Sequence, residues 1–256
     1  MEANKLCCMD NLELMKDMAD ESVDLIYGDI LYGTDKDFGD YQDLPADRDE
    51  IEDFYRPRIK EMHRILKNTG SIYLHMDYRI NHWIRCILDD VFGYENFRNE
   101  IIWCYKSGGS SKTNFSNKHD NMLFYSKSNN YKFNVQKEKS YNRGYKRYNF
   151  DGVKEYKDNK GWYTRVNMKD YWEINMVGRT SKERVDYKTQ KPKKLLKRII
   201  KASSNKGDIV FDPFLGSGTT VVVAEELDRK WIGCDINEKS IEVTKDRLSS
   251  VQKRLF

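Results

Sequence analysis

Short apolar runs and amphipathic stretches alternate along most of the chain. The apolar runs, each too short for a helix and typical of a buried strand, are Val23–Tyr27, Ser71–Met76, Ile209–Phe211 and Trp231–Cys234. Stretches with helical spacing of apolar residues predict helices over Asp53–Leu66, Asn81–Phe92, Lys193–Ser203 and Thr219–Leu227. This alternation predicts an α/β fold in which a largely parallel sheet is covered by helices on both faces.

Local turn signals predict where several elements end. We expect a short helix within Cys7–Lys16, followed by a turn. Asn68-Thr69-Gly70 is predicted to end the helix over Asp53–Leu66 as a glycine C-cap, and Gly93 to stop the helix that follows.

The middle of the chain differs from the rest in pattern and in charge. Asn99–Tyr105 and Asn121–Ser126 look like a strand pair, joined by a polar segment, Lys106–Asp120, that is too long for a simple hairpin and is therefore functional or disordered. From Lys127 to Glu173 the periodicity fades, and aromatic residues interleave with basic ones. Residues 105–190 hold 19 Lys and Arg against 9 Asp and Glu, a net charge of +10, within a chain whose total is only +4.

This basic middle predicts a polyanionic partner. Cations that pair with phosphates, beside rings that stack on bases, are what a nucleic-acid surface requires. The candidate DNA-binding residues are Lys106, Lys112, Lys118, Arg143, Lys146, Arg147 and Arg165. The alternative is a small β-rich insert with a solvated basic exterior.

Length and composition narrow the class of protein. A chain of 256 residues suits one large α/β domain with an inserted subdomain. No run approaches the roughly 20 apolar residues of a membrane span, and no apolar segment follows the first methionine, so we expect neither a membrane anchor nor a secretory leader. The five cysteines form no C-x-x-C pair and the four histidines do not cluster with them, so we expect no disulfide framework, no metal site and a cytoplasmic location.

The stretch from Gly207 to Asp235 holds the clearest candidate site. It reads as strand, glycine-rich turn, helix and strand, and such a turn lets backbone approach a ligand closely. Asp235, at the end of the second strand, stands where a ribose diol would be held. Val221 replaces the third glycine of the dinucleotide fingerprint, and Asp212 would repel a phosphate but would suit a cofactor with a positive amino group. These residues indicate S-adenosylmethionine rather than NAD, with an ordinary strand–turn–helix as the plainer alternative.

A second candidate site follows the first predicted strand, at Asp29-Ile30-Leu31-Tyr32. In open α/β sheets, functional groups lie just beyond the carboxyl ends of strands, so Asp29 and Tyr32 are placed to line a cleft. The alternative is a capping aspartate and a core tyrosine at a strand end.

Several motifs together resemble the β-class amino-group DNA methyltransferases, from Val23 to about Arg247. The motifs are Ser181-Lys182-Glu183-Arg184, Thr189-Gln190-Lys191-Pro192 before a helix, and Asp212-Pro213-Phe214-Leu215-Gly216-Ser217-Gly218-Thr219-Thr220 as the cofactor loop. The catalytic segment is early, the cofactor loop is late and a recognition region lies between them, as in the family. The resemblance implies a seven-stranded Rossmann-like methyltransferase sheet, with a catalytic half at 1–104, a target-recognition insert at 105–180 and a cofactor-binding half at 181–256.

The resemblance also implies roles for individual residues. Asp212 would take the methionine amino group of S-adenosylmethionine, Asp235 would hold the ribose hydroxyls, and residues 189–191 would lie near the methionine end. The residues implied to bind the cofactor are Asp29, Thr189, Gln190, Lys191, Asp212, Phe214, Gly216, Gly218, Thr219 and Asp235.

The catalytic tetrapeptide departs from the family pattern, which has Asp, Asn or Ser, then two prolines, then Tyr or Phe. An exocyclic amine is a poor nucleophile, and hydrogen bonds accepted from its N–H groups return electron density to nitrogen. The Asp29 carboxylate and the carbonyl of Ile30 can accept these bonds, and Tyr32 can stack on a base flipped from the duplex. Without the prolines the φ angles are no longer fixed, and the N–H groups of Ile30 and Leu31 need partners.

The leading hypothesis is therefore a sequence-specific DNA adenine-N6 methyltransferase, because cytosine-N4 members of the family more often begin the tetrapeptide with Ser. Cytosine-N4 methylation, RNA methylation and a catalytically silent module that binds cofactor and DNA are the alternatives. The expected partner is double-stranded DNA. The resemblance further suggests a homodimer and a cognate restriction endonuclease.

Overall fold

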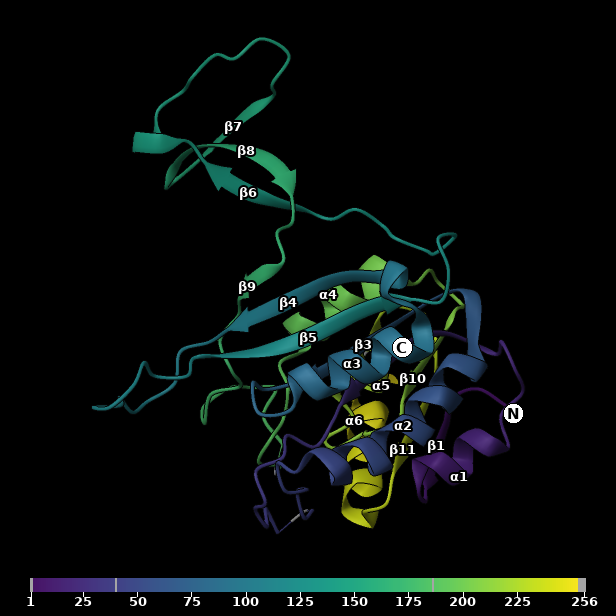
Figure 1. The fold of residues 1–256 in the computed structure, drawn as a ribbon. Helices are drawn as coiled ribbons and strands as arrows, with labels where there is room; N and C mark the ends of the chain where they lie inside the picture. The colour runs from purple at the N-terminus through teal and green to yellow at the C-terminus, as the bar shows by residue number, and fades with distance from the viewer. Residues whose placement is uncertain (1, 40, 186, 253–256) are drawn as a thin grey trace.

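The computed structural model describes residues 2–39, 41–185 and 187–252. Within these residues, an eight-stranded sheet with the order β1-β11-β10-β2-β3-β5-β4-β9 forms the centre of the molecule (Figure 1). In chain order its strands are β1 (Lys5–Cys8), β2 (Val23–Asp29), β3 (Leu66–Met76), β4 (Phe97–Cys104), β5 (His119–Ser126), β9 (Tyr171–Glu173), β10 (Ile209–Asp212) and β11 (Lys230–Asp235).

The sheet is mixed and mostly parallel. Strands β1, β11, β10, β2 and β3 pair in parallel, β5 is antiparallel to both β3 and β4, and β9 pairs in parallel with β4. The predicted α/β fold is confirmed. The sheet has eight strands rather than seven because β9, which lies in the expected recognition region, adds to its edge.

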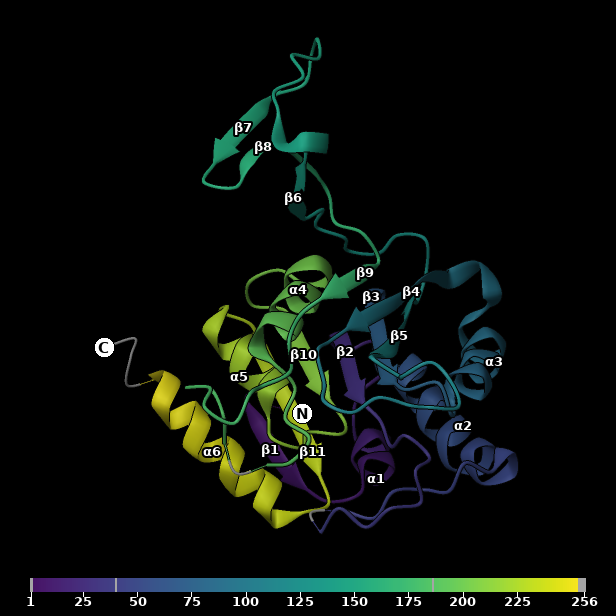
Figure 2. The ribbon, with the colours of Figure 1, turned by 90° about the vertical axis from the view of Figure 1, so that its left-hand side faces the viewer.

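The described helices cover both faces of the sheet. Figure 2 shows α1 (Asn11–Lys16), α2 (Arg48–Ile65) and α3 (Asn81–Phe92) on one face, and α4 (Lys193–Ser203), α5 (Thr219–Glu226) and α6 (Glu238–Gln252) on the other. Two short 3-10 turns, η1 (Tyr94–Asn96) and η2 (Arg143–Tyr145), complete the helical elements of the described residues.

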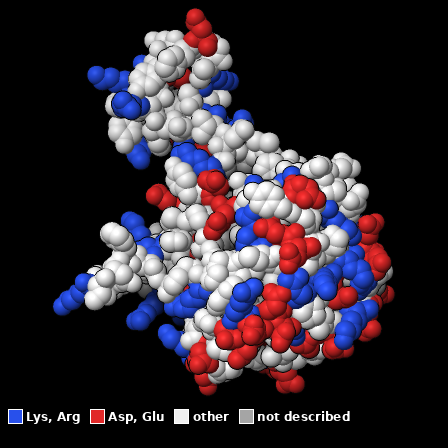
Figure 3. All heavy atoms as spheres, viewed as in Figure 1, with Lys and Arg blue, Asp and Glu red and all other residues white. Residues whose placement is uncertain are grey.

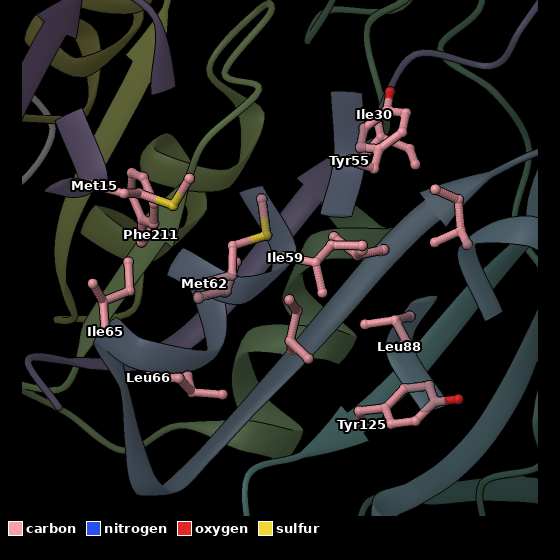
Figure 4. Packing of buried hydrophobic residues seen from close by; sticks show 14 of the residues in the cluster. Met15, Ile30, Tyr55, Ile59, Met62, Ile65, Leu66, Leu88, Tyr125 and Phe211 are labelled. Carbon is pink, nitrogen blue, oxygen red and sulfur yellow. The ribbon is translucent and has the colours of Figure 1, made fainter. Parts of the chain in front are cut away.

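Alternation along the strands divides the core into two layers. Leu74 of β3 and Leu123 of β5 pack with α1–α3, whereas their neighbours Tyr73 and Phe124 pack with α4–α6. Figure 4 shows the first layer, in which Met62 and other side chains of α2 lie against the sheet. Each fully buried aliphatic side chain of this kind stabilises the fold by about 1.5–3 kcal/mol, so both faces hold the strand ends in place.

One predicted element end is wrong. The chain passes directly from α2 into β3 at Leu66, so Asn68-Thr69-Gly70 lies inside β3 and does not cap the helix. Leu66 is fully buried and pairs with Val23 of β2, and this tertiary pairing overrides the local turn signal. The short helix expected within Cys7–Lys16 is confirmed as α1, which begins at Asn11 because the residues before it form β1 against β11. Gly93 ends α3 as predicted, with φ +88°.

A three-stranded antiparallel sheet stands apart from the main sheet, at the top of Figure 1. It consists of β6 (Lys137–Tyr141), β7 (Glu155–Asp158) and β8 (Gly161–Asn167), in the order β6-β8-β7. Its two ends meet where the N–H of Met168 donates to the carbonyl of Gln136 at 3.0 Å. The range 105–180 thus holds this small sheet, but it also holds β5 and β9, which belong to the main sheet.

Candidate functional site

A cavity that opens to solvent lies at the carboxyl ends of β2 and β10. Its lining comes from the end of β2, the segment before α4 and the turn between β10 and α5. The lining residues are Tyr27, Asp29, Tyr187, Thr189, Lys191, Leu196, Asp212, Phe214, Leu215, Gly216, Ser217, Thr219 and Thr220. Asp29 of one candidate site and the glycine turn of the other therefore line one cavity, whereas Tyr32 and Asp235 are not among its lining residues.

The turn between β10 and α5 depends on two glycines with positive φ. Gly216 has φ +50° and Gly218 has φ +72°, a region that side chains disfavour. A Cβ on Gly218 would lie 2.1 Å from Oγ1 of Thr244 in α6, so only glycine fits there. Gly218 therefore supports the turn from outside the cavity, whereas Gly216 lines the cavity itself.

Arg247 of α6 ties the same turn to the body of the protein. Its buried guanidinium donates to the carbonyl of Ser217 at 2.5 Å and to the hydroxyl of Thr219 at 3.0 Å. The Thr219 hydroxyl in turn donates to the carbonyl of Lys191 at 3.1 Å. Thr219 thus joins the turn to the segment before α4. Arg247 belongs to no recognisable sequence motif, so its contacts with the turn could not be predicted from the sequence.

Asp212 is a buried carboxyl group that forms no salt bridge with any described Lys, Arg or His. Only 2% of the residue is exposed, and it accepts hydrogen bonds from the N–H of Phe214 at 3.1 Å and from the side chain of Thr220. Burial, together with the charges of Asp29 and Asp235, raises the pKa of Asp212 to about 7. A ligand with a positive amino group would supply the missing counter-charge at this position.

Asp235 ends β11 and holds the glycine turn. Its carboxylate accepts hydrogen bonds from the N–H of Gly216 at 2.8 Å and from the N–H of Asn237 at 2.9 Å. Burial raises the pKa of Asp235 above its usual value. Asp235 is not among the residues that line the cavity, and it is only partly buried.

The segment before α4 contributes two of its three predicted residues to the cavity. Thr189 lines the cavity, and its side chain bonds the hydroxyl of Tyr41. Gln190 points elsewhere: its Oε1 accepts from the N–H of Val185 at 2.9 Å, and its Nε2 donates to the carbonyl of Glu183 at 2.6 Å. Gln190 therefore braces the preceding turn.

Asp29 lies at the end of β2 between an ammonium and a phenol. Its Oδ2 accepts from Nζ of Lys191 at 2.6 Å, and its Oδ1 accepts from the hydroxyl of Tyr32 at 2.9 Å. The Lys191 ammonium is also 5.2 Å from the centre of the Tyr32 ring. A carboxylate offers about four lone-pair sites, so Asp29 can still accept hydrogen bonds from a further donor.

A second acidic group, absent from the predicted site, faces the same tyrosine. Asp120 of β5 is buried; its Oδ2 lies 3.3 Å from the Tyr32 hydroxyl and 3.2 Å from Nε2 of His75, and its Oδ1 accepts from the hydroxyl of Tyr105 at 2.8 Å. Burial acts to raise the pKa of Asp120, but His75, the Lys191 charge and Tyr105 outweigh it, and the pKa lies below its usual value. Asp120 is therefore an ionised acceptor beside the Tyr32 hydroxyl, which it shares with Asp29.

His75 connects this acid to the neighbouring strand. It is fully buried on β3, and its Nδ1 lies 2.8 Å from the hydroxyl of Tyr27. His75 is the second-last residue of the predicted strand Ser71–Met76 beside β2, so the expectation that functional groups gather near the carboxyl ends of parallel strands could have identified it. Asp120 begins an antiparallel strand, which that rule does not cover.

The two backbone N–H groups that a Pro-Pro sequence would lack both have partners. The N–H of Ile30 donates to the carbonyl of His75 at 3.1 Å, and the N–H of Leu31 donates to the hydroxyl of Tyr55 at 2.9 Å. The Tyr55 hydroxyl in turn donates to the carbonyl of Leu31 at 3.3 Å. The turn after Asp29 is therefore held by β3 and α2.

The basic candidate residues fall on two protruding segments. Lys106, Lys112 and Lys118 belong to the loop between β4 and β5, and Arg143, Lys146, Arg147 and Arg165 belong to the small sheet and its turns. Figure 3 shows Lys and Arg side chains on both protrusions. Lys118 braces its loop by donating to the carbonyls of Ser107, Gly108 and Gly109, each at 3.0 Å. The other six cationic residues are all exposed.

Two expected absences can be examined over residues 2–39, 41–185 and 187–252. No cluster of three or more His, Cys, Asp or Glu side chains there is arranged to hold a metal ion. No helix in these ranges combines the length and the hydropathy that crossing a membrane requires.

The fold and the cavity together define a class. A glycine turn follows β10 near the middle of the sheet. Asp212 before this turn is buried without a positive partner among the described residues, and Asp235 ends the neighbouring strand β11. This arrangement is that of an α/β protein that binds a nucleoside cofactor with a cationic end.

Comparison with known proteins identifies the family. A family model for DNA methylases of the N6 and N4 type matches residues 23–246. The type II methyltransferase M.HpaI of Haemophilus parainfluenzae is 34% identical over 247 residues, which are 96% of this chain and 74% of that protein. The DNA adenine methyltransferase YhdJ of Escherichia coli (strain K12) is 34% identical over 254 residues, 96% of this chain and 83% of that protein. The chain therefore belongs to the N6/N4 amino-group DNA methylase family.

Solved structures agree in fold. The PvuII cytosine-N4-specific DNA methyltransferase has a TM-score of 0.70 at 17% identity, over 99% of this chain and 93% of that one. The M1.HpyAVI complex with S-adenosylmethionine has a TM-score of 0.62 at 21% identity, over 95% and 99%. The protein is an S-adenosylmethionine-dependent DNA methyltransferase, and its cavity fits that cofactor because the unpaired acid Asp212 and the glycine turn face the same space.

Proposed function

We propose that the protein transfers a methyl group from S-adenosylmethionine to the N6 amino group of adenine within a specific sequence of duplex DNA. The observation that carries this proposal is the position of Asp29, whose carboxylate lines the same cavity as Asp212 and the glycine turn. An acceptor for the target amine and a binding site for the positive end of the cofactor therefore face one space. Aspartate at the start of the tetrapeptide favours adenine, and the relative YhdJ is named a DNA adenine methyltransferase.

The proposed chemistry depends on hydrogen-bond acceptors around the target amine. The Asp29 carboxylate and the Ile30 carbonyl accept hydrogen bonds from the two N–H groups of the target amine. These bonds return electron density to the nitrogen as the new N–C bond forms. The bound cofactor supplies the methyl group as an electrophile on sulfur; the S–CH₃ bond breaks as the N–CH₃ bond forms, and the product amine releases one proton to solvent. Burial raises the pKa of Tyr32 well above its usual value, so Tyr32 stays a neutral phenol and stacks on the flipped base.

The cofactor-binding residues take two kinds of role in this proposal. Asp212 pairs with the methionine amino group, and Thr189 and Lys191 line the same cavity. The turn from Phe214 to Thr219 closes on the cofactor. Asp235 supports that turn and bonds the ribose hydroxyls with its remaining lone pairs. Gln190 and Gly218 act indirectly, by bracing the backbone.

The proposed DNA interface is formed by the two basic protrusions. Lys106, Lys112 and Lys118 approach the duplex near the cavity, because their loop leads into β5, where Asp120 belongs to the catalytic network. Arg143, Lys146, Arg147 and Arg165 contact phosphates farther along. Phe115 in the same loop is 98% exposed, and apolar side chains of this kind insert between base steps beside a distorted site.

Cytosine-N4 methylation is the second candidate. The PvuII enzyme with this stated specificity shares the fold, and both target bases present an exocyclic amine to the same pair of acceptors. A catalytically silent module is disfavoured, because the missing prolines were its only support and both N–H groups they expose are hydrogen-bonded. An RNA substrate is a third candidate, against which the large basic insert argues.

The decisive experiment is methylation of mixed-sequence duplex DNA with labelled cofactor, followed by separation of the nucleosides. We expect N6-methyldeoxyadenosine and no N4-methyldeoxycytidine among the nucleosides, and competition by duplex DNA but not by structured RNA. Recovery of N4-methyldeoxycytidine alone would make cytosine the target, and binding without transfer would favour the silent module.

Asp29→Ala tests the role of the carboxylate. Removing one acceptor that stabilises developing charge lowers kcat by about 10²–10³-fold, so we expect transfer to be nearly abolished while the cofactor Kd changes little. Asp29→Asn keeps one acceptor oxygen and should retain part of the activity. Asp246→Ala, on the exposed side of α6, is the matched control. Full activity of Asp29→Ala would remove this residue from the mechanism.

Three further expectations concern the cellular location, the oligomeric state and a partner enzyme. We propose a cytoplasmic location, where S-adenosylmethionine and chromosomal DNA are both present. A homodimer would be detected by light scattering at micromolar concentration. A cognate restriction endonuclease is suggested by the type II methyltransferases among the relatives, and it would cut unmethylated DNA at the site this protein modifies.

A further inference from the structure

The tetrapeptide Asp29-Ile30-Leu31-Tyr32 holds its shape without prolines, and the structure indicates how. Tyr55 is fully buried on α2, and its hydroxyl contacts both polar groups of Leu31: it accepts from the N–H at 2.9 Å and donates to the carbonyl at 3.3 Å. Its ring lies against those of Phe54 and Phe214, with centroid distances of 4.9 and 6.2 Å. The hydroxyl is thus presented from a rigid, packed position.

The contact with the N–H of Leu31 controls the orientation of the Ile30 carbonyl. These two groups belong to one peptide unit, which is planar, and no described peptide bond is cis. In a trans unit the N–H and the C=O point in opposite directions. Because the N–H of Leu31 points to Tyr55 in the core, the carbonyl of Ile30 points away from α2. The preceding unit is held in the same way by the bond from Ile30 N–H to the His75 carbonyl.

We propose that Tyr55 is a positioning residue for methyl transfer, whose hydroxyl fixes the Ile30–Leu31 peptide plane and so aims the Ile30 carbonyl at the target amine. The inference rests on the proposed function, in which that carbonyl is the second acceptor of the amine. Two prolines would restrict the turn through their rings. In this chain a hydrogen bond from a distant helix performs that task.

Tyr55→Phe removes the hydroxyl and leaves the ring packing intact. A displacement of a reacting group by about 1 Å can cost on the order of 10²-fold in rate, so we expect kcat for DNA methylation to fall about 10- to 100-fold. The cofactor Kd and the KM for DNA should stay within about twofold. Tyr73→Phe is the matched control, because it also removes a buried hydroxyl, one that lies 2.7 Å from Ser203 in the other core layer.

Leu31→Pro provides the rescue. Proline has no N–H that needs a partner and restricts φ on its own, so Leu31→Pro should make the turn independent of the hydroxyl. We expect Leu31→Pro alone to be active, and the double variant Tyr55→Phe/Leu31→Pro to recover kcat to within about threefold of Leu31→Pro. A kcat of Tyr55→Phe equal to that of the original protein, or a defect that Leu31→Pro does not relieve, overturns the proposal.

Hydrogen–deuterium exchange supplies a readout that does not need activity. The Leu31 amide should exchange slowly in the original protein and in Tyr73→Phe, and at least tenfold faster in Tyr55→Phe. Equal exchange in all three proteins also overturns the proposal. If the original protein transfers no methyl group, the proposed function fails, and the exchange rates still decide whether Tyr55 holds the turn.

Discussion

At the scale of single residues, the proposed pairing of Asp212 with the amino group of the cofactor would change the charge of Asp212. Burial keeps the pKa of this carboxyl at about 7 in the free protein, so at pH 6 it is mostly protonated. A positive amino group placed beside it favours the ionised form and lowers that pKa. Binding must therefore release a proton whenever the pH is below about 7.

The pH dependence of cofactor binding follows from this release. We expect the Kd of S-adenosylhomocysteine, which keeps the same amino-acid end, to fall by up to tenfold per pH unit between about pH 5.5 and 6.5 and to level off above about pH 7. Asp212→Asn should bind more weakly with a nearly flat profile. Isothermal titration in two buffers of different ionisation enthalpy measures both the Kd and the proton released. A flat profile for the unaltered protein would contradict the assignment of the amino group to Asp212.

The same group affects the stability of the cofactor-free protein. Its folded pKa of about 7 lies above the ordinary 3.8, so between these values the folded chain holds a proton that the unfolded chain releases. The proton bound to Asp212 stabilises the folded state at low pH, and this contribution to the free energy of unfolding is lost as the pH rises from about 4 to 7. We expect the free energy of unfolding to decrease less between pH 5 and pH 7.5 in Asp212→Asn than in the original protein, as measured by urea denaturation.

At the scale of elements, the turn between β10 and α5 joins local backbone geometry to tertiary packing. Gly218 has φ +72°, and Thr244 of α6 occupies the space where a side chain would begin. Arg247 of the same helix bonds Ser217 and Thr219. The cofactor turn is therefore shaped by a helix that follows it in the chain.

Gly218→Ala tests this dependence. The left-handed backbone alone costs about 1–2 kcal/mol for a residue with a Cβ, and the contact with Thr244 adds to that cost. Because 1 kcal/mol shifts the Tm of a domain this size by roughly 2–4 °C, we expect a decrease of at least about 4 °C and weaker cofactor binding. Gly178→Ala is the control, since nothing lies within 4 Å of a Cβ there and its φ is not positive. An unchanged Tm for Gly218→Ala would show that α6 moves to accommodate the added methyl group, and would contradict this prediction.

At the scale of the whole molecule, the small sheet is separable from the main sheet. Its strands pair only with one another within the described residues, and its ends meet at Gln136 and Met168. Residues 137–167 carry nine Lys and Arg against four Asp and Glu. The catalytic cavity takes none of its lining from this segment.

Excision of residues 137–167, with Gln136 joined to Met168 through two glycines, should therefore leave a folded protein that binds the cofactor with an unchanged Kd. We expect its affinity for duplex DNA to fall and to depend less steeply on salt, because each lost phosphate contact removes about 0.9 from the slope of log K against log salt. Fluorescence anisotropy at several salt concentrations measures this slope. An unchanged slope would place the DNA on another surface. The double variant Lys146→Gln/Arg147→Gln in the intact chain is the control, because it removes two cations without the structural disruption that a deletion can cause.

Much of the element order follows from the sequence because it depends on local pattern. The spans of α3 and α4 coincide with the amphipathic stretches, and β2 and β10 with the apolar runs that precede the two acids. The end of α2 could not be predicted in this way. Gly70 resembles a helix cap in isolation, but burial of Leu66 beside Val23 extends the strand through it.

The sequence by itself determined the family-defining parts of this protein: the acid and glycines of the cofactor turn, the acid after the first long strand, and the basic middle. Each is a local signal, in which residue type and spacing state the chemistry directly. Only the tertiary structure brought Asp29, Lys191 and Asp212 to one cavity, added His75 and Asp120 to the network, and supplied Tyr55 as a partner for Leu31. These contacts join residues far apart in the chain, and their geometry depends on how the helices and strands pack, which no local pattern contains.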